Sequence, residues 1–173
     1  MPTQAAPIGS TLTDINSGSD GLVIGYKHIG TKIYHLYFED ENICQYVSDN
    51  ILFHKWNPTT KSIQTAKTIA LAIQNRPKPV SAKYAFGTMI ISHKFYAEDI
   101  DYIIIDNGQQ LPDGRIIYLI AYKCKSATKW FVDYQPEDAN MFTLPKTLPT
   151  QESIALAKSI LFEYVTSHAF TKF

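Results

Sequence analysis

The sequence contains few of the residues from which catalytic, metal and nucleotide sites are usually built. Its two cysteines, Cys44 and Cys124, have no CxxC spacing and cannot hold a zinc ion by themselves. Only 8 glycines occur, and none lies in a GxGxxG or GxxxxGK phosphate-binding motif. The 5 histidines lack the i, i+4 spacing of a helical metal site. We therefore expect no bound metal and no cofactor.

The chain also lacks a charge excess and a long hydrophobic run. It has 16 basic and 16 acidic residues, and only Arg76 and Arg115 among the basic ones are arginines. Phosphate recognition favours arginine because its planar guanidinium binds in a bidentate manner, so this balance argues against a dedicated duplex-DNA-binding protein. No stretch approaches roughly 18 apolar residues, and the N-terminus has no basic and apolar leader. We expect a cytoplasmic protein with no membrane partner.

Aromatic residues and β-forming patterns, by contrast, are abundant. Apolar residues make up 45% and charged residues 18% of the sequence, which are the proportions of a globular protein. Residues 1–20 are rich in small and turn-forming residues and are predicted to be a flexible N-terminal arm. Residues 21–173 are predicted to form a single α+β domain. The predicted strands cover residues 22–29, 31–38, 43–48, 51–56, 84–95, 101–106, 115–124 and 128–134.

Two segments have the apolar periodicity of helices. In the first, Asn57 is the expected N-cap and Pro58 the first helical residue, and the helix must end before Pro77. The second helix is expected from about residue 150 to about residue 166. The residues that share one face are Ile63, Ala66, Ala70 and Ile73 in the first helix, and Ile154, Ala157, Leu161 and Tyr164 in the second.

The two helical segments are similar in sequence, which indicates an internal duplication. Residues 58–73 align without gaps on residues 149–164, with seven of sixteen positions identical, where chance alone gives about one. Upstream, residues 31–42 align on residues 128–140 with one insertion. Before that, the Tyr-Lys pair at 26–27 aligns on the same pair at 122–123. Three blocks in the same order favour a duplicated structural unit.

We therefore predict an α+β fold in which a unit of β-hairpin, loop and helix, roughly ββββα, occurs twice. The sheet is expected to be mostly antiparallel and to be packed by two amphipathic helices. The first copy is expected over about residues 21–76 and the second over about residues 115–168, with connecting strands over about residues 80–114.

A basic and aromatic pattern follows the repeated hairpins and is the main candidate for a ligand or partner surface. The candidate residues are Tyr26, Lys27, Lys32 and Tyr34 in the first copy, and Tyr122, Lys123, Lys125, Lys129 and Trp130 in the second. Aromatic rings stack on bases and lysines neutralise phosphates, so the pattern is typical of single-stranded nucleic-acid binding. Two ββββα units in tandem also resemble, in fold alone, the whirly-like and PUR-like single-strand binders, whose residue motifs this sequence lacks. The alternative is that the lysines protect strand edges from aggregation.

Three other groups of residues have a weaker case for chemistry. Cys44 and His54 would form a nucleophile and base if the fold brought them together, but neither has a counterpart in the second copy. The acidic segments at 39–41 and 137–138 lack the spacing and central glycine of a calcium loop and are interpreted as solvated turns. The acidic stretch at 98–106 flanks a buried strand and is interpreted as loop and turn residues.

The sequence favours a non-catalytic binding protein that recognises a macromolecular partner. The binding site is expected on a sheet face or in the groove between the repeats. A protein or a single-stranded nucleic acid is the expected partner, since a duplicated unit offers a pseudo-symmetric surface to an extended or dimeric ligand. The alternative from another class is a small enzyme, which would need a pocket between the repeats with carboxylates or histidines of shifted pKa.

Overall fold

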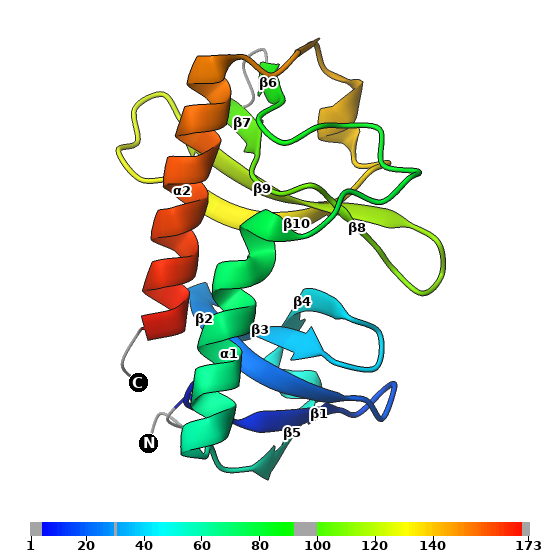
Figure 1. Ribbon diagram of the computed structural model, residues 1–173, viewed down its shortest axis with the longest axis vertical. Helices are drawn as coiled ribbons and strands as arrows, with labels where there is room; N and C mark the ends of the chain where they lie inside the picture. The colour runs from blue at the N-terminus through cyan, green and yellow to red at the C-terminus, as the bar shows by residue number, and fades with distance from the viewer. Residues whose placement is uncertain (1–4, 30, 92–99, 171–173) are drawn as a thin grey trace. The chain divides into compact units, whose positions relative to one another are not determined.

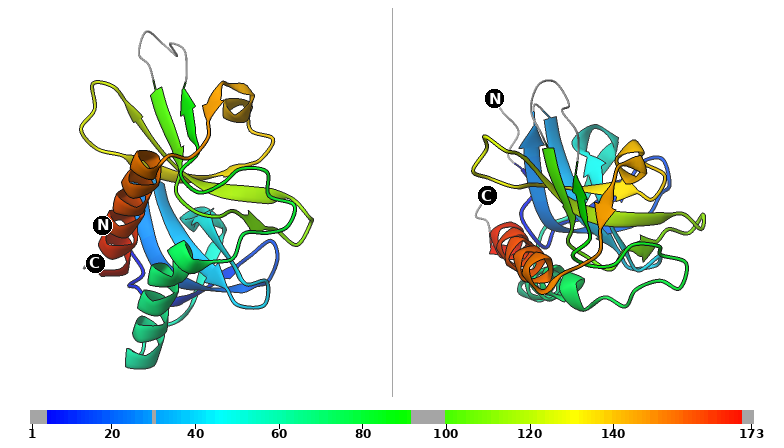
Figure 2. Two further views of the ribbon diagram at one scale, coloured as in Figure 1. Left: turned by 45° about the horizontal axis from the view of Figure 1, so that its top comes forward. Right: turned by 90° about the horizontal axis from the view of Figure 1, so that it is seen from above.

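The computed structural model describes residues 5–29, 31–91 and 100–170 (Figure 1). The chain divides into two compact units, one formed by residues 1–73 and 165–173 and the other by residues 74–164. Each unit contains one antiparallel sheet, and its last strand is followed by a helix. Both sheets can be followed from two further directions in Figure 2.

The first unit contains a five-stranded sheet with the strand order β4-β3-β2-β1-β5. Its strands are β1 (Thr11–Asp14), β2 (Asp20–Ile29), β3 (Thr31–Phe38), β4 (Ile43–Ser48) and β5 (Leu52–Trp56). The helix α1 (Thr60–Ala72) follows β5 and packs against β2. Four of these strands match the sequence prediction to within two residues at each end, because they are short apolar and aromatic runs separated by turn residues.

The connection between β4 and β5 forces this sheet to curl. The two strands lie at opposite edges of the sheet, yet only the 3-10 turn η1 (Asp49–Ile51) separates them in the chain. That link spans at most about 14 Å, whereas the outer strands of a flat five-stranded sheet lie about 19 Å apart. The two edges must therefore approach each other at this end.

Strand β1 overturns the prediction of a flexible arm for the described part of residues 1–20. It lies between β2 and β5 and pairs with both of them. Leu12 at its centre is 0% exposed, and Ala6 and Ile8 before it are also buried. The strand was missed because four residues with one buried position show no periodicity, and its stability comes from pairing with distant segments.

The second unit repeats this arrangement with the strand order β10-β9-β7-β6-β11. Its strands are β6 (Met89–Ile91), β7 (Ile100–Ile104), β9 (Ile116–Cys124), β10 (Phe131–Pro136) and β11 (Lys146–Thr147), and a short strand β8 (Gln109–Gln110) pairs with β9. The helix α2 (Gln151–Phe170) follows β11. Residues 80–114, predicted to be connecting strands, supply β6, β7 and β8 of this sheet. Of the strand predicted over 84–95, residues 89–91 form β6, and residues 92–95 lie outside the described part.

The common strand order confirms the predicted duplication of a ββββα unit. In each sheet four strands follow one another across the sheet, and a fifth returns to pair with the first. A short 3-10 helix precedes that fifth strand in both units, η1 in the first and η3 (Asn140–Thr143) in the second. The upstream alignment of residues 31–42 on residues 128–140 is wrong, however. Strand β3 lies inside its sheet, whereas β10 lies at the edge and corresponds to β4.

Backbone hydrogen bonds place the true correspondence further upstream. Gly9 N donates to Val23 O in the first unit, as Gly87 N donates to Ile104 O in the second (2.9 Å each). Val23 N in turn donates to Ser10 O (2.9 Å), as Ile104 N donates to Thr88 O (3.0 Å). The turn before each strand is closed by Ser10 N to Pro7 O and by Thr88 N to Ala85 O (3.1 Å each). Residues 7–12 therefore correspond to residues 85–90. Sequence comparison missed this match because the two segments share only the glycine.

The two helices begin with the same hydrogen-bonded cap. Thr59 caps α1: its hydroxyl accepts from Ser62 N (3.0 Å), and its own N–H donates to Ser62 Oγ (2.8 Å). Thr150 and Ser153 make the same pair of bonds at the start of α2, at 3.1 Å and 2.8 Å. This capping box replaces the predicted cap at Asn57, because it satisfies two N–H groups that the first turn leaves without partners.

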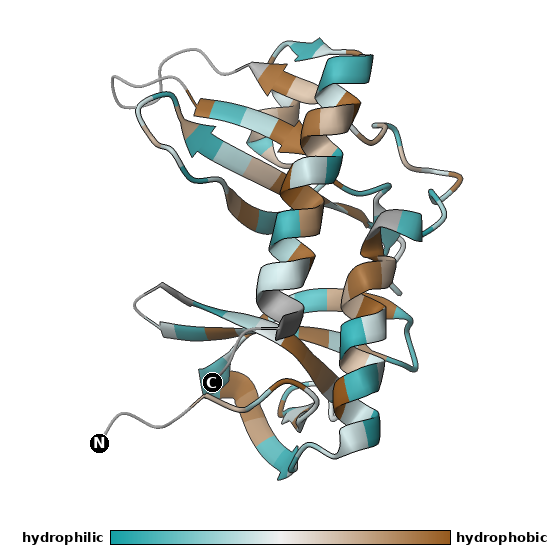
Figure 3. Ribbon diagram, turned by 60° about the vertical axis from the view of Figure 1, so that its left-hand side comes forward, coloured by the Kyte–Doolittle hydropathy of each residue, from teal (hydrophilic) through white to brown (hydrophobic). Residues whose placement is uncertain are grey.

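Small residues lie on the buried stripe of each helix. Ala66 and Ala70 of α1 and Ala157 of α2 are buried, as the shared apolar stripe predicted. Figure 3 shows hydrophobic and hydrophilic residues alternating along both helices. Within the described residues, no helix is long and apolar enough to cross a membrane.

Candidate binding surface

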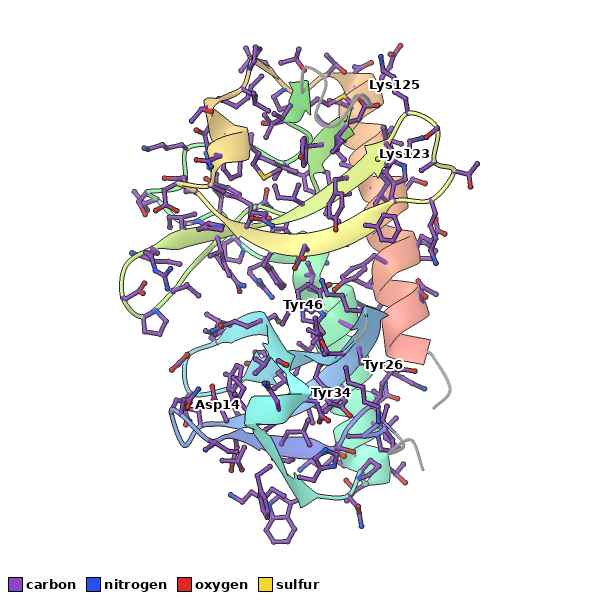
Figure 4. All side chains as sticks on the ribbon, turned by 180° about the vertical axis from the view of Figure 1, so that it is seen from behind. Asp14, Tyr26, Tyr34, Tyr46, Lys123 and Lys125 are labelled. Carbon is purple, nitrogen blue, oxygen red and sulfur yellow. The ribbon has the colours of Figure 1, made fainter. Side chains whose placement is uncertain are left out.

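The first copy of the predicted surface lies largely in the protein interior. Tyr34 is 0% exposed, and its hydroxyl accepts a hydrogen bond from the backbone N–H of Ala6 (2.8 Å; Figure 4). Burial raises the pKa of Tyr34. Because side chains alternate along a strand, Tyr34 points to the same face as the buried Leu36. Its place in a ligand surface is therefore a wrong prediction.

The other three residues of the first copy are partly covered. Tyr26 lies directly opposite Tyr34 in the β2–β3 register, with the ring centroids 6.3 Å apart. The Lys27 Nζ lies 4.1 Å from the centroid of the Tyr46 ring. The Lys32 Nζ is buried and has no hydrogen-bond partner among the described residues. These ammonium groups are turned toward the protein, which leaves the first copy a poor platform for a ligand.

The second copy is brought together on one hairpin. Tyr122 and Lys123 lie near the end of β9, Lys125 and Lys129 are exposed in the loop, and Trp130 precedes β10. The Lys123 Nζ lies 5.0 Å from the centroid of the Trp130 ring. Figure 4 labels Lys123 and Lys125 on this hairpin. We call these five residues, together with Phe131, the hairpin surface.

Phe131 belongs to a row of aromatic residues that sequence reasoning missed. In the register of the sheet, Tyr122 of β9 lies directly opposite both Tyr102 of β7 and Phe131 of β10. The Tyr122 and Phe131 rings are stacked, with centroids 5.8 Å apart and planes at 27°, and the Tyr102 and Tyr122 centroids are 6.2 Å apart. Tyr102 and Tyr122 are partly buried inside the sheet, whereas Phe131 on the edge strand is 50% exposed. The row therefore runs from the interior of the sheet to solvent. Only the strand register reveals this row.

The hairpin surface lies in a locally basic part of a neutral chain. Residues 114–132 contain four basic residues and no acidic residue. Asp101 lies opposite Lys123 in the register, and Asp133 follows on β10. Lys129 is exposed and makes no ion pair with a residue that the structure describes. The charge of the loop is thus only partly balanced by its neighbours.

A second set of exposed aromatic residues lies on the edge strand β5. Phe53 is 64% and Trp56 is 65% exposed. Beside them is a cavity of about 180 Å³, which is lined by Ala6, Pro7, Ser10, His54, Lys55, Trp56 and Asn57. Its charges are balanced, because the Lys55 Nζ lies 2.6 Å from Asp20 Oδ2 and the His54 Nε2 lies 3.6 Å from Asp49 Oδ1. The cavity is smaller than the usual small-molecule site of about 300 Å³ or more.

The fold separates Cys44 from His54. Cys44 is fully buried and lies opposite Tyr37 in the β3–β4 register. His54 instead meets the edge of the Tyr34 ring, with centroids 6.3 Å apart. Tyr34 and Tyr37 are three residues apart in one strand and therefore point to opposite faces. A Cys44–His54 nucleophile and base is excluded by this arrangement.

Glu137, predicted to lie in a solvated turn, takes part in a partly buried network instead. Its Oε2 accepts a hydrogen bond from the Tyr118 hydroxyl (2.5 Å), which itself accepts from the N–H groups of Lys83 (2.9 Å) and Tyr84 (3.1 Å). Tyr118 is 0% exposed, and burial, followed by the bond to Glu137, raises its pKa. The hydroxyl therefore stays protonated and fixes the loop before β6. In the first unit, by contrast, Glu39, Asp40 and Glu41 are exposed as predicted.

The acidic stretch around β7 contains one buried carboxyl group. Asp106 Oδ1 accepts from Gly108 N (2.9 Å) and Leu119 N (3.0 Å), while Oδ2 is buried without a hydrogen-bond partner among the described residues. Burial raises the pKa of Asp106 to about 6, against the opposing effects of these two bonds and of Arg76. Asp101 lies five residues away, at the other end of the strand, or about 16 Å. The two carboxyls therefore form no acid/base pair, and Glu98 and Asp99 lie outside the described residues.

Asp106→Asn is expected to remove a pH dependence of stability. The pKa of Asp106 is about 6 in the folded state against an ordinary 3.8, so the folded protein binds this proton more tightly than the unfolded chain. The resulting stability is full below about pH 4 and is lost as the pH rises through about 6, which amounts to about 3 kcal/mol. Asparagine keeps an acceptor for both N–H groups and has no charge to bury. Urea unfolding at acidic and neutral pH measures the difference.

The matched control for this prediction is Asp113→Asn. Asp113 is exposed and pairs with Arg115 Nε at 2.7 Å, so its neutralisation is expected to leave the pH dependence of stability between pH 4 and pH 7 unchanged. If Asp106→Asn keeps the wild-type loss of stability between pH 4 and pH 7, then Asp106 is not the responsible group.

Among the described residues, no group of three or more His, Cys, Asp or Glu side chains is placed to hold a metal ion. Comparison of the chain with protein-family models, with curated proteins and with solved structures finds no match.

Proposed function

We propose that this protein is a non-catalytic binding protein that recognises a macromolecular partner through the hairpin surface. The observation that carries this proposal is the joint placement of exposed lysines and stacked aromatic rings on one β-hairpin. Phe131 stacks on Tyr122, and Lys123 lies over Trp130, so the rings are held in place before a partner arrives. Rigid aromatic side chains give a large contact area with little loss of conformational entropy.

The hairpin surface has a stronger case than the aromatic residues of β5. Phe53 and Trp56 are exposed, but the nearby charges of Lys55 and His54 are matched by acidic partners. The hairpin surface combines a half-exposed ring with Lys129, which is exposed and makes no ion pair with a described residue. Charge of one sign next to an aromatic anchor favours a partner of complementary charge.

The buried acidic groups support a non-catalytic role. Asp106 accepts two backbone hydrogen bonds that hold its turn against β9. Glu137 and Tyr118 together hold the backbone of Lys83 and Tyr84. Each of these groups is used to fix the fold, and none of them faces the cavity beside β5.

Selection of ligands from defined libraries tests this proposal. The full chain is presented with a phage-displayed library of random peptides and with a pool of random single-stranded oligonucleotides. We expect at least one library to yield ligands whose affinity falls about tenfold in Phe131→Ala and in Lys129→Ala, because an anchor or a charge at an interface contributes about 1.4 kcal/mol.

Phe53→Ala is the control, because Phe53 is also an exposed aromatic residue on an edge strand, in the other unit. It is expected to leave these affinities unchanged. The proposal fails if neither library yields a ligand, or if the ligands bind Phe131→Ala and Lys129→Ala as tightly as the wild type.

A further inference from the structure

We infer that the partner of the hairpin surface is a single-stranded nucleic acid, an inference that rests on the proposed function. The first argument is charge. Residues 114–132 hold Arg115, which is paired with Asp113, and Lys123, Lys125 and Lys129, and no acidic residue, although the chain as a whole is neutral. Three of these four basic residues belong to the hairpin surface. A local positive charge that contrasts with a neutral chain is complementary to a phosphate backbone.

The second argument is the position of the aromatic rings relative to that charge. Phe131 is half-exposed and is supported on one side by Tyr122 at 5.8 Å. Lys129, two residues before Phe131, is exposed. Trp130 and Lys123, whose Nζ lies 5.0 Å from the Trp130 ring, alternate with Phe131 and Tyr122 and belong to the opposite face of the hairpin. A ring that is supported by the protein and open to solvent can stack on a base, while nearby ammonium groups reach the phosphates.

The kind of basic residue favours a single strand over a duplex. The hairpin surface contains lysines and no arginine, so it lacks the bidentate group that reads guanine edges in the major groove. In a duplex the base faces are stacked on one another and are not available to Phe131 or Trp130. In a single strand they are available, and stacking on them tolerates any base sequence. An acidic peptide would use the lysines but offers no planar bases to the rings.

The test is fluorescence anisotropy of labelled oligo-dT and oligo-U, about 12 nucleotides long, with the full chain. The wild type is expected to bind at about 50 mM NaCl and to lose affinity as the salt rises to about 200 mM. Contacts from two or three lysines give a slope of about −1.4 to −2.1 for log K against log salt. Lys129→Ala is expected to reduce this slope by about 0.7, and Phe131→Ala to lower the affinity about 5- to 150-fold with the slope unchanged.

Two controls separate this effect from general charge and from misfolding. Lys61→Ala removes an exposed lysine of α1, and Phe53→Ala removes an exposed ring of β5; both are expected to keep the wild-type affinity and slope. Thermal unfolding of each variant checks that it is folded. We expect all of them to fold, because every substituted residue is exposed.

The outcomes distinguish this inference from the proposed function. Absence of oligonucleotide binding at low salt overturns the inference, and the proposed function then stands if selected peptides still depend on Phe131 and Lys129. The inference is also overturned if oligonucleotides bind Phe131→Ala and Lys129→Ala as tightly as the wild type. If every ligand selected from both libraries is equally insensitive to these substitutions, the proposed function is rejected too.

Discussion

Gly9→Ala is expected to lower the free energy of unfolding by about 3 kcal/mol. Gly9 has φ +89°, a conformation that costs an L-residue about 1–2 kcal/mol. A Cβ atom at this position would also lie 2.8 Å from Ile63 N and 2.9 Å from Ile63 Cα. Both atoms belong to the backbone of α1, so relief requires the helix to move, and such overpacking costs about 1–3 kcal/mol. Urea unfolding of the full chain measures the loss.

Gly87→Ala is the equivalent change in the second unit and is expected to cost less. Gly87 has φ +88°, and its nearest neighbour would be the Ile154 Cγ1 at 2.9 Å, with the Ile154 Cα at 3.3 Å. A side-chain atom moves aside more easily than a helix backbone. We therefore expect the free energy of unfolding to fall by about 2 kcal/mol, which is close to the cost of placing an L-residue at a positive φ.

Gly18→Ala is the control for both substitutions. Gly18 also has a positive φ, +73°, but no atom lies within 4 Å of the added Cβ. Only the conformational cost of about 1 kcal/mol remains. The expected order of destabilisation is Gly9, then Gly87, then Gly18. Equal losses of unfolding free energy at the three positions would contradict this prediction, because they would show that close packing of Gly9 and Gly87 against the helices adds nothing to the cost of substitution.

Tyr118→Phe is expected to destabilise the protein by about 2–3 kcal/mol. The substitution keeps the ring in its core position, among residues such as Ile104 and Ile120, but removes the hydroxyl. Tyr84 N–H then loses its acceptor and the Glu137 carboxylate loses a donor, and each unsatisfied buried group costs about 1–3 kcal/mol. Lys83 N–H keeps a bond to Glu137 Oε2 at 3.1 Å, which limits the loss. Urea unfolding again gives the measurement.

Tyr34→Phe provides a matched comparison in the first unit. Tyr34 is also 0% exposed, but its hydroxyl holds one backbone group, the N–H of Ala6. One lost bond is expected to cost about 1–2 kcal/mol. A loss at Tyr34 as large as that at Tyr118 would contradict the role given to the Glu137 network.

Both helices and most strands were predictable because their signals are local. The stripe of Ala66 and Ala70 and the stripe of Ala157 and Leu161 repeat every three to four residues, and all four side chains are buried as predicted. The continuous apolar run at 116–121 is likewise fully buried in the interior strand β9. In each case the burial of a whole element follows from residues that are neighbours in the chain.

The candidate surface was predicted only in part. Five residues of the second copy do lie on one hairpin, because strand, loop and strand are consecutive in sequence. Phe131 was missed because its importance depends on the register that sets it against Tyr122. Tyr34 was misplaced because a tyrosine can point to either face of a strand, and the buried face became known only from its bond to Ala6.

The sequence by itself determined that the protein is built twice from one ββββα unit, since the repeated helix carries its own cap, stripe and spacing. The tertiary structure decided where each unit begins, because β1 and β6 are short strands held by pairing with distant segments. It also decided which tyrosines are core and which rings meet solvent. These properties depend on long-range hydrogen bonds and strand register, to which local periodicity is insensitive.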